Sequence, residues 1–82
     1  MTEQKITVYS TTWCADCRRT KAFLDQQGVA YREIDIEQDE AAAELVMKHN
    51  DGKRRVPTLE VAGAYYGNPT IPELRSILSG AA

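Results

Sequence analysis

The chain carries the stretch KITVYSTTWCADC at residues 5–17, and this stretch decides the fold that we expect. Residues 5–9 are rich in β-branched and aromatic side chains, which is typical of a strand, and the polar residues after Tyr9 end it. Two cysteines, Cys14 and Cys17, follow directly, and we expect a helix to begin at Cys14 or at Ala15. The stretch therefore predicts a strand that leads through a short loop into a helix with two thiols in its first turn.

Cys14 and Cys17 are the only cysteines among the 82 residues of the sequence. Side chains three residues apart on a helix lie on one side of it and can close into a disulfide. The positive end of the helix favours a thiolate, and a thiolate beside a second thiol can carry out thiol–disulfide exchange. A zinc site needs about four ligands, whereas the chain adds only His49 and carboxylates to the thiols. We therefore expect a redox pair and no metal site.

The remaining elements are predicted from apolar spacing and turn residues. We expect Thr11 or Thr12 to cap the first helix and Gly28 to end it, because the position just past a helix end often has a positive φ. Thr70 and Glu73 form a capping box for the last helix. The pattern predicts the later elements at residues 29–36 (strand), 38–49 (helix), 58–61 (strand), 64–66 (edge strand) and after residue 70 (helix).

The predicted order is βαβαββα, in a single domain over residues 1–82, because so short a chain supports one modest core. A right-handed crossover makes the first two strands parallel. The short link at Ala62 and Gly63 makes the last two strands antiparallel. We therefore expect an α/β fold in which a mixed four-stranded sheet is flanked by three helices.

Composition narrows the possible partners. A formal net charge of −2 gives no reason to expect nucleic acid as a partner. No stretch has the length and apolar character of a signal peptide or a membrane span, so we expect no membrane partner and a cytoplasmic location. Disulfides in that compartment are usually transient and catalytic, which suits a lone pair of cysteines. We also expect a monomer.

The order of elements, with two thiols between the first strand and the first helix, resembles the thioredoxin fold, and its details resemble the glutaredoxin family. The residues that carry the resemblance are Val8, Tyr9, Cys14, Cys17, Arg19, Lys21, Gly52, Lys53, Val56 and Pro57. Trp13 and residues 67–70 look most like mycoredoxins, which are glutaredoxin-like proteins that use mycothiol. The resemblance implies a thiol–disulfide oxidoreductase with no tightly bound cofactor and a low-molecular-weight thiol as co-substrate. Its protein partners would be mixed disulfides or protein disulfides.

The resemblance also implies roles for individual residues. It makes Cys14 the nucleophile, more exposed than Cys17, which is the resolving thiol. It implies a cis bond before Pro57, which leaves the backbone of Val56 free to pair with a substrate. The substrate-binding residues that we expect are Trp13, Arg55, Val56, Pro57, Asn68 and Thr70. Two alternatives stay open: Trp13 could instead be a packed aromatic residue, and residues 53–55 could be a solvated turn rather than a clamp for a carboxylate or phosphate.

Three departures from the glutaredoxin pattern are present, and the third bears on the co-substrate. Ala15 and Asp16 stand where dithiol glutaredoxins commonly have Pro and Tyr, and Thr11 stands where many have a lysine. Gly67 stands alone where glutathione-using members have two glycines, and Thr70 stands where they have an acid. A hydroxyl cannot neutralise the ammonium group of glutathione, so a sugar-based thiol such as mycothiol or bacillithiol is favoured.

Two other functions remain compatible with the sequence. One is a thioredoxin-like electron donor that is recharged by a flavoprotein reductase. The other is an iron–sulfur carrier, in which two Cys14 thiolates and two small thiols hold a [2Fe–2S] cluster between monomers.

Overall fold

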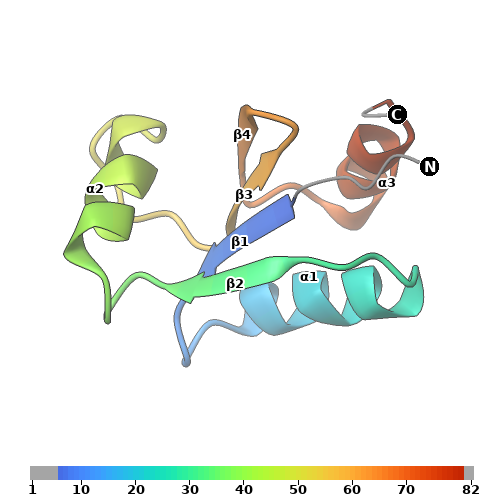
Figure 1. Cartoon of the computed structure of the whole chain (residues 1–82), viewed down its shortest axis with the longest axis horizontal. Helices are drawn as coiled ribbons and strands as arrows, with labels where there is room; N and C mark the ends of the chain where they lie inside the picture. Colours follow the sequence, from blue (N-terminus) through green and yellow to red (C-terminus); the bar gives the residue numbers. More distant parts are fainter. Residues whose placement is uncertain (1–5, 81–82) are drawn as a thin grey trace.

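A four-stranded mixed sheet forms the centre of the structure, a computed structural model that describes residues 6–80 (Figure 1). The strand order is β2-β1-β3-β4; β1 runs parallel to β2 and antiparallel to β3, and β3 runs antiparallel to β4. Along the chain the elements are β1 (Ile6–Ser10), α1 (Ala15–Gln26), β2 (Arg32–Asp35), α2 (Glu40–Lys48), β3 (Thr58–Val61), β4 (Ala64–Gly67) and α3 (Ile71–Gly80). The predicted βαβαββα order and the mixed sheet are confirmed.

The helices cover both faces of the sheet because side chains alternate along each strand. Ile6 and Val8 of β1 belong to a core cluster with Phe23 and Leu24 of α1 and Leu74 of α3. The second cluster joins β1 to α2: its buried members are Tyr9 of β1, Ile36 of the loop after β2, and Ala42, Ala43 and Val46 of α2. Thus α1 and α3 pack on one face and α2 packs on the other (Figure 1). Both clusters include residues of β1, which leads directly into the cysteine turn.

The end of α1 explains why β2 is shorter than predicted. Gly28 has a φ of 68°, as expected of the residue past a helix end. Its N–H donates to the Asp25 carbonyl at 3.1 Å, and the Val29 N–H donates to the Leu24 carbonyl at 3.0 Å. These two bonds form a Schellman motif. Residues 29–31 therefore lead out of the helix, and the strand begins at Arg32 instead of at residue 29.

The other helix ends show which side chains cap them. The Asp39 carboxylate accepts the Ala42 N–H at 3.0 Å, so α2 begins at Glu40, two residues later than predicted. In the predicted capping box, the Thr70 N–H donates to Glu73 at 2.8 Å and the Glu73 N–H donates to the Thr70 hydroxyl at 3.2 Å. The capping box is confirmed, and it fixes the loop before α3 in place.

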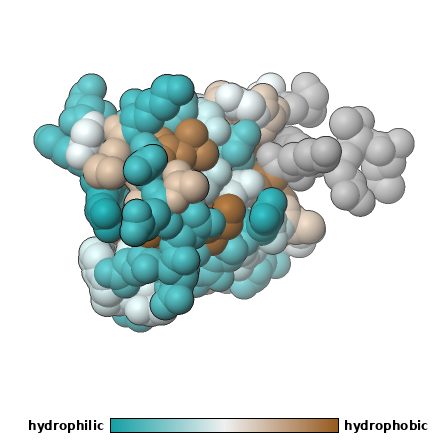
Figure 2. All heavy atoms as spheres, turned by 60° about the vertical axis from the view of Figure 1, so that its left-hand side comes forward, coloured by the Kyte–Doolittle hydropathy of each residue, from teal (hydrophilic) through white to brown (hydrophobic). Residues whose placement is uncertain are grey.

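The face on the α2 side of the molecule is largely hydrophilic, with hydrophobic residues in small separate groups (Figure 2). Within residues 6–80, no helix combines the length and apolar character needed to cross a bilayer. Trp13 is the large hydrophobic side chain that stands out on the surface, with 65% of its area exposed.

Candidate active site

Cys14 is the N-cap residue of α1, in place of the expected Thr11 or Thr12. Its backbone is extended, and its Sγ accepts a hydrogen bond from the Cys17 N–H at 3.0 Å. Sulfur thus takes the part that a side-chain oxygen usually plays at an N-cap. A thiolate accepts such a bond better than a thiol does and faces the positive end of the helix. The position is therefore suited to a nucleophilic sulfur.

Both thiols are free, and they differ in burial. Cys14 has 5% of its surface exposed and Cys17 has none, which confirms the expected order. The access to Cys14 is nevertheless narrower than we expected, because the loop before β3 lies against it. The Cys14 Sγ donates to the carbonyl oxygen of Val56 at 3.7 Å. The backbone of Val56 therefore borders the Cys14 sulfur.

Cys17 lies in the protein interior, and its environment favours the neutral thiol. Burial and the hydrogen bond with Cys14 together raise the pKa of Cys17 to about 12, against the opposing effect of a bond from the Thr11 backbone. The Lys21 ammonium, one helical turn away, also lowers this pKa. At neutral pH Cys17 is therefore protonated, and it must lose its proton before it can attack a disulfide.

The loop before β3 carries the expected cis bond between Val56 and Pro57. Pro57 is buried, and its carbonyl oxygen accepts the Asn68 N–H at 2.7 Å. The loop is thereby tied to the segment that precedes α3. Arg55, one residue before Val56, is exposed, and its aliphatic chain passes close to Gly67 at the end of β4. Lys53 and Arg54 are also exposed.

Trp13 projects from the loop before α1 and is not packed in the core. Its indole N–H donates to the Glu37 carboxylate at 3.1 Å. This bond links the loop before α1 to the loop between β2 and α2. The indole ring is therefore exposed next to Cys14 in the chain, and the bond to Glu37 holds it in position.

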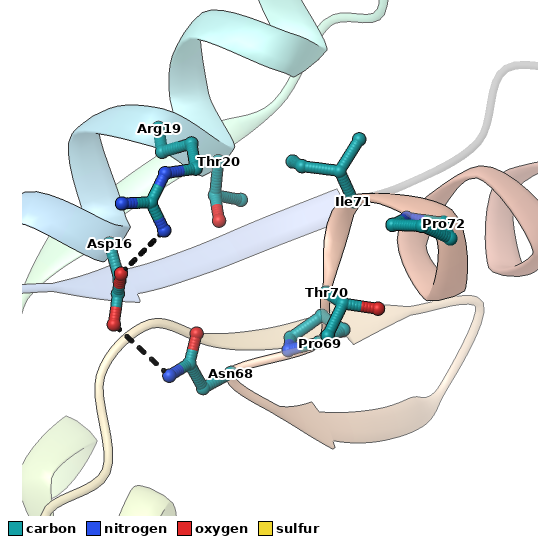
Figure 3. Close-up of a pocket in the computed structure, with 8 residues that line it drawn as sticks. All are labelled: Asp16, Arg19, Thr20, Asn68, Pro69, Thr70, Ile71 and Pro72. Atoms are coloured by element: carbon teal, nitrogen blue, oxygen red, sulfur yellow. Dashed lines mark hydrogen bonds and ion pairs between the residues drawn. The ribbon is translucent and has the colours of Figure 1, made fainter.

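A pocket of about 390 Å³ lies between α1 on one side and the start of α3 with the segment before it on the other (Figure 3). Its walls come from Asp16, Arg19 and Thr20 on one side and from Asn68, Pro69, Thr70, Ile71 and Pro72 on the other. The pocket brings the predicted residues Asn68 and Thr70 together, whereas Trp13 and Arg55 do not line it.

Sequence reasoning missed the part that Asp16 plays in this pocket. Asp16 accepts from Arg19 at 2.7 Å and from the Asn68 side-chain amide at 3.2 Å (Figure 3). The spacing of Asp16 and Arg19 on one helix signals their pairing. No local pattern signals the contact with Asn68, because the two residues are far apart in the sequence.

Comparison with known proteins places this site in a family. The glutaredoxin family model matches residues 6–66. A protein of Mycobacterium tuberculosis named as a glutaredoxin is 43% identical over 74 residues, which cover 89% of this chain and 88% of that protein. Mycoredoxin 1 of Corynebacterium glutamicum is 43% identical over 70 residues, which cover 84% of this chain and 86% of that protein. The crystal structure of the thioredoxin-like protein BC3987 has a TM-score of 0.78 and 30% identity, covering 88% of this chain and 97% of that chain. The chain therefore belongs to the glutaredoxin family of thiol–disulfide oxidoreductases.

Proposed function

We propose that this glutaredoxin reduces mixed disulfides between proteins and a low-molecular-weight thiol, with mycothiol or bacillithiol preferred over glutathione. Protein disulfides are a second substrate class. The observation that supports this function best is the Cys14 sulfur at the N-cap of α1, 3.0 Å from the Cys17 amide nitrogen. We further propose that the 82 residues act as one domain, as a monomer, in the cytoplasm.

In the first step, the Cys14 thiolate attacks the sulfur of the small thiol in the mixed disulfide. A bond forms between Cys14 and that sulfur, and the protein substrate leaves as a thiolate, which then takes up a proton. The substrate is reduced, and the oxidised small thiol is transferred to Cys14. The hydrogen bond from the Cys17 N–H stabilises the attacking thiolate before the step.

The second step can follow either of two routes. A second small thiolate can attack the small-thiol sulfur on Cys14, which releases a small-molecule disulfide and the Cys14 thiolate. Alternatively, Cys17 loses its proton and attacks Cys14, which gives a Cys14–Cys17 disulfide and the free small thiolate. Burial, the largest cause of the raised pKa of Cys17, also acts when Cys14 is occupied by the small thiol, so Cys17 contributes little thiolate at neutral pH. We therefore propose that the first route carries most of the turnover of mixed disulfides.

The other residues are proposed to bind substrate. Val56 offers its backbone beside Cys14, Pro57 holds that loop, and Trp13 gives an exposed aromatic surface next to the nucleophile. Arg55 is placed to meet a carboxylate or phosphate of the substrate.

Asn68 and Thr70 line the pocket where we place the headgroup of the small thiol. Asp16 is the acidic residue among those that line the pocket, and its two oxygens already accept from Arg19 and Asn68. A free ammonium group would thus find no unpaired carboxylate there. This supports a hydroxyl-rich, uncharged headgroup such as that of mycothiol more than that of bacillithiol, which carries an ammonium group and two carboxylates. The 43% identity with Mycoredoxin 1 points the same way.

The test is a panel of one single-cysteine peptide capped with mycothiol, bacillithiol or glutathione, each assayed with the matching free thiol. We expect faster turnover with the sugar-based caps than with glutathione. Equal turnover of all three, or no turnover of the sugar-based caps, would contradict the proposed co-substrate.

The same panel separates the roles of the two cysteines. We expect Cys14→Ser to abolish turnover of every mixed disulfide, because the nucleophile is lost. Cys17→Ser is expected to retain removal of the small cap and to lose reduction of protein disulfides. Loss of both activities in Cys17→Ser would contradict the assigned roles.

A second candidate is a thioredoxin-like electron donor, favoured by the 30% identity with a structure described as thioredoxin-like. In that case a thioredoxin reductase with NADPH would reduce the Cys14–Cys17 disulfide directly. The measurement is NADPH oxidation with the oxidised protein as substrate. Fast oxidation without any small thiol would favour this candidate over the first.

A further inference from the structure

Asp16 lies between the two cysteines, in the first turn of α1, and forms one wall of the pocket. Its Oδ1 accepts from Arg19 at 2.7 Å and its Oδ2 accepts from the Asn68 amide at 3.2 Å. Figure 3 shows the carboxylate between these two side chains, facing the loop before α3. Both oxygens are thus engaged by residues of the pocket itself.

Arg19 supplies the positive charge among the pocket-lining residues, and Asp16 supplies the negative charge. Their side chains are 65% and 43% exposed, so the pair lies at the surface, where a ligand can reach it. Because the two charges are paired, the pocket presents little net charge to a headgroup. Its other polar groups, on Thr20, Asn68 and Thr70, are neutral donors and acceptors.

Asn68 connects this charge pair to the rest of the active site. Its backbone has a φ of 44°, and its N–H donates to the Pro57 carbonyl at 2.7 Å while its side chain donates to Asp16. Asp16 therefore neutralises the charge of Arg19 and also holds the loop that lines the pocket through its bond with Asn68.

We propose that Asp16 determines the co-substrate specificity of this protein: by pairing with Arg19 it selects an uncharged headgroup over one that carries net negative charge. This proposal depends on the proposed function in one respect, namely that the headgroup of the small thiol binds in this pocket. Without the Asp16 carboxylate, Arg19 is free to attract a carboxylate of the co-substrate. Asp16 is thus a specificity residue, and Cys14 remains the nucleophile.

The test compares one single-cysteine peptide capped either with glutathione, which carries net negative charge, or with 1-thioglycerol, which is uncharged. The variant is Asp16→Asn, whose amide oxygen can still accept the Asn68 bond but carries no charge. We expect the ratio of kcat/KM for the glutathione cap over the thioglycerol cap to rise about three-fold, as is typical of one exposed charge pair. The change is expected mainly in KM, and it should shrink at high salt. Any change in Cys14 reactivity affects both caps and cancels in the ratio.

Arg19→Gln and the double variant complete the cycle. In Arg19→Gln the Asp16 charge is unpaired, so the ratio is expected to fall about three-fold. In the double variant both charges are gone, and the increase seen in Asp16→Asn is expected to disappear. An unchanged ratio in Asp16→Asn, or an increase that persists without Arg19, would overturn the proposal. Neither cap is a sugar-based thiol, so this result can fail while the preference for mycothiol over glutathione stands, and the reverse.

Discussion

Gly67, the last residue of β4, shapes the site through the side chain that it lacks. A Cβ atom at this position would collide with the Asn50 side-chain oxygen and would lie 2.6 Å from the Cδ of Arg55. Asn50 has little freedom to move, because its amide donates to the Val46 carbonyl at 2.7 Å and to the Thr58 hydroxyl at 3.2 Å. Gly67 therefore lets the chain of Arg55 cross the end of β4 beside the loop before β3.

We predict that Gly67→Ala lowers the free energy of unfolding by about 1–2 kcal/mol, because Arg55 and Asn50 must both shift to make room. Urea denaturation followed by far-ultraviolet circular dichroism measures this. Gly80→Ala is the matched control: Gly80 is the last residue of α3 and has open space around its Cβ position. The control should lose no stability, and equal losses in the two variants would contradict the steric argument.

At the scale of elements, α1 shows what sequence patterns can and cannot predict. The strand before it, the dithiol at its start and the Gly28 stop are local signals, and each predicted feature is present in the structure. The N-cap was predicted wrongly because hydroxyl side chains usually fill that position, and here the Cys14 sulfur does so.

The site itself was only partly predictable. The pairing of the cysteines was inferred from their spacing and the cis Pro57 from a family resemblance, whereas the Asp16–Asn68 contact depends on how α1 packs beside the loop before α3. The narrow access to Cys14 likewise depends on Val56, which is distant in sequence. Contacts of this kind require the tertiary structure, because no local pattern determines them.

A polar network joins α1 to the sheet next to the cysteines. The Glu33 carboxylate of β2 accepts from Lys21 at 2.6 Å and from the Ser10 hydroxyl at 2.7 Å. The Lys21 bond, and after it the Ser10 bond, lower the pKa of Glu33, and the Glu33 bond raises the pKa of Lys21. The network therefore stabilises the fold above the ordinary pKa of Glu33, and the effect is lost as the pH falls through the lowered value.

We predict that Glu33→Gln lowers the free energy of unfolding by less than about 1 kcal/mol at pH 7, since the pair is partly exposed. At a pH below the lowered pKa of Glu33 the variant and the unaltered protein should be equally stable, because the carboxyl is then neutral in both. Thermal unfolding at the two pH values measures the difference. Glu44→Gln, an exposed position on α2, serves as the control and should be neutral at both. A loss that is the same at both pH values would show that the charge is not responsible.

At the scale of the whole molecule, several acidic groups release their protons later in the folded state than in the unfolded chain. Burial raises the pKa of Cys17 to about 12, and it also raises the pKa values of Tyr9, Tyr31 and Tyr65. At a pH above the ordinary pKa of such a group, the unfolded chain releases the proton while the folded protein still holds it. This difference lowers the free energy of unfolding. The reduced protein should therefore lose stability as the solution becomes alkaline.

Cys17 accounts for the first part of that loss. Its ordinary pKa is 9.0, so the unfolded chain releases the thiol proton from about pH 9, whereas the folded protein keeps it until about pH 12. The free energy of unfolding should fall in this window, with a slope that approaches about 1.4 kcal/mol per pH unit for this one proton. Urea denaturation of the reduced protein between pH 8 and about pH 10, below the main ionisation of the tyrosines, measures the slope. In Cys17→Ser the buried hydroxyl does not ionise, so the slope should be shallower. Cys14 is present in both proteins, so its thiol does not account for the difference. The same slope in both proteins would mean that Cys17 is no harder to ionise in the folded state than in the unfolded chain. The raised pKa would then be no obstacle to the attack of Cys17 on a disulfide at Cys14.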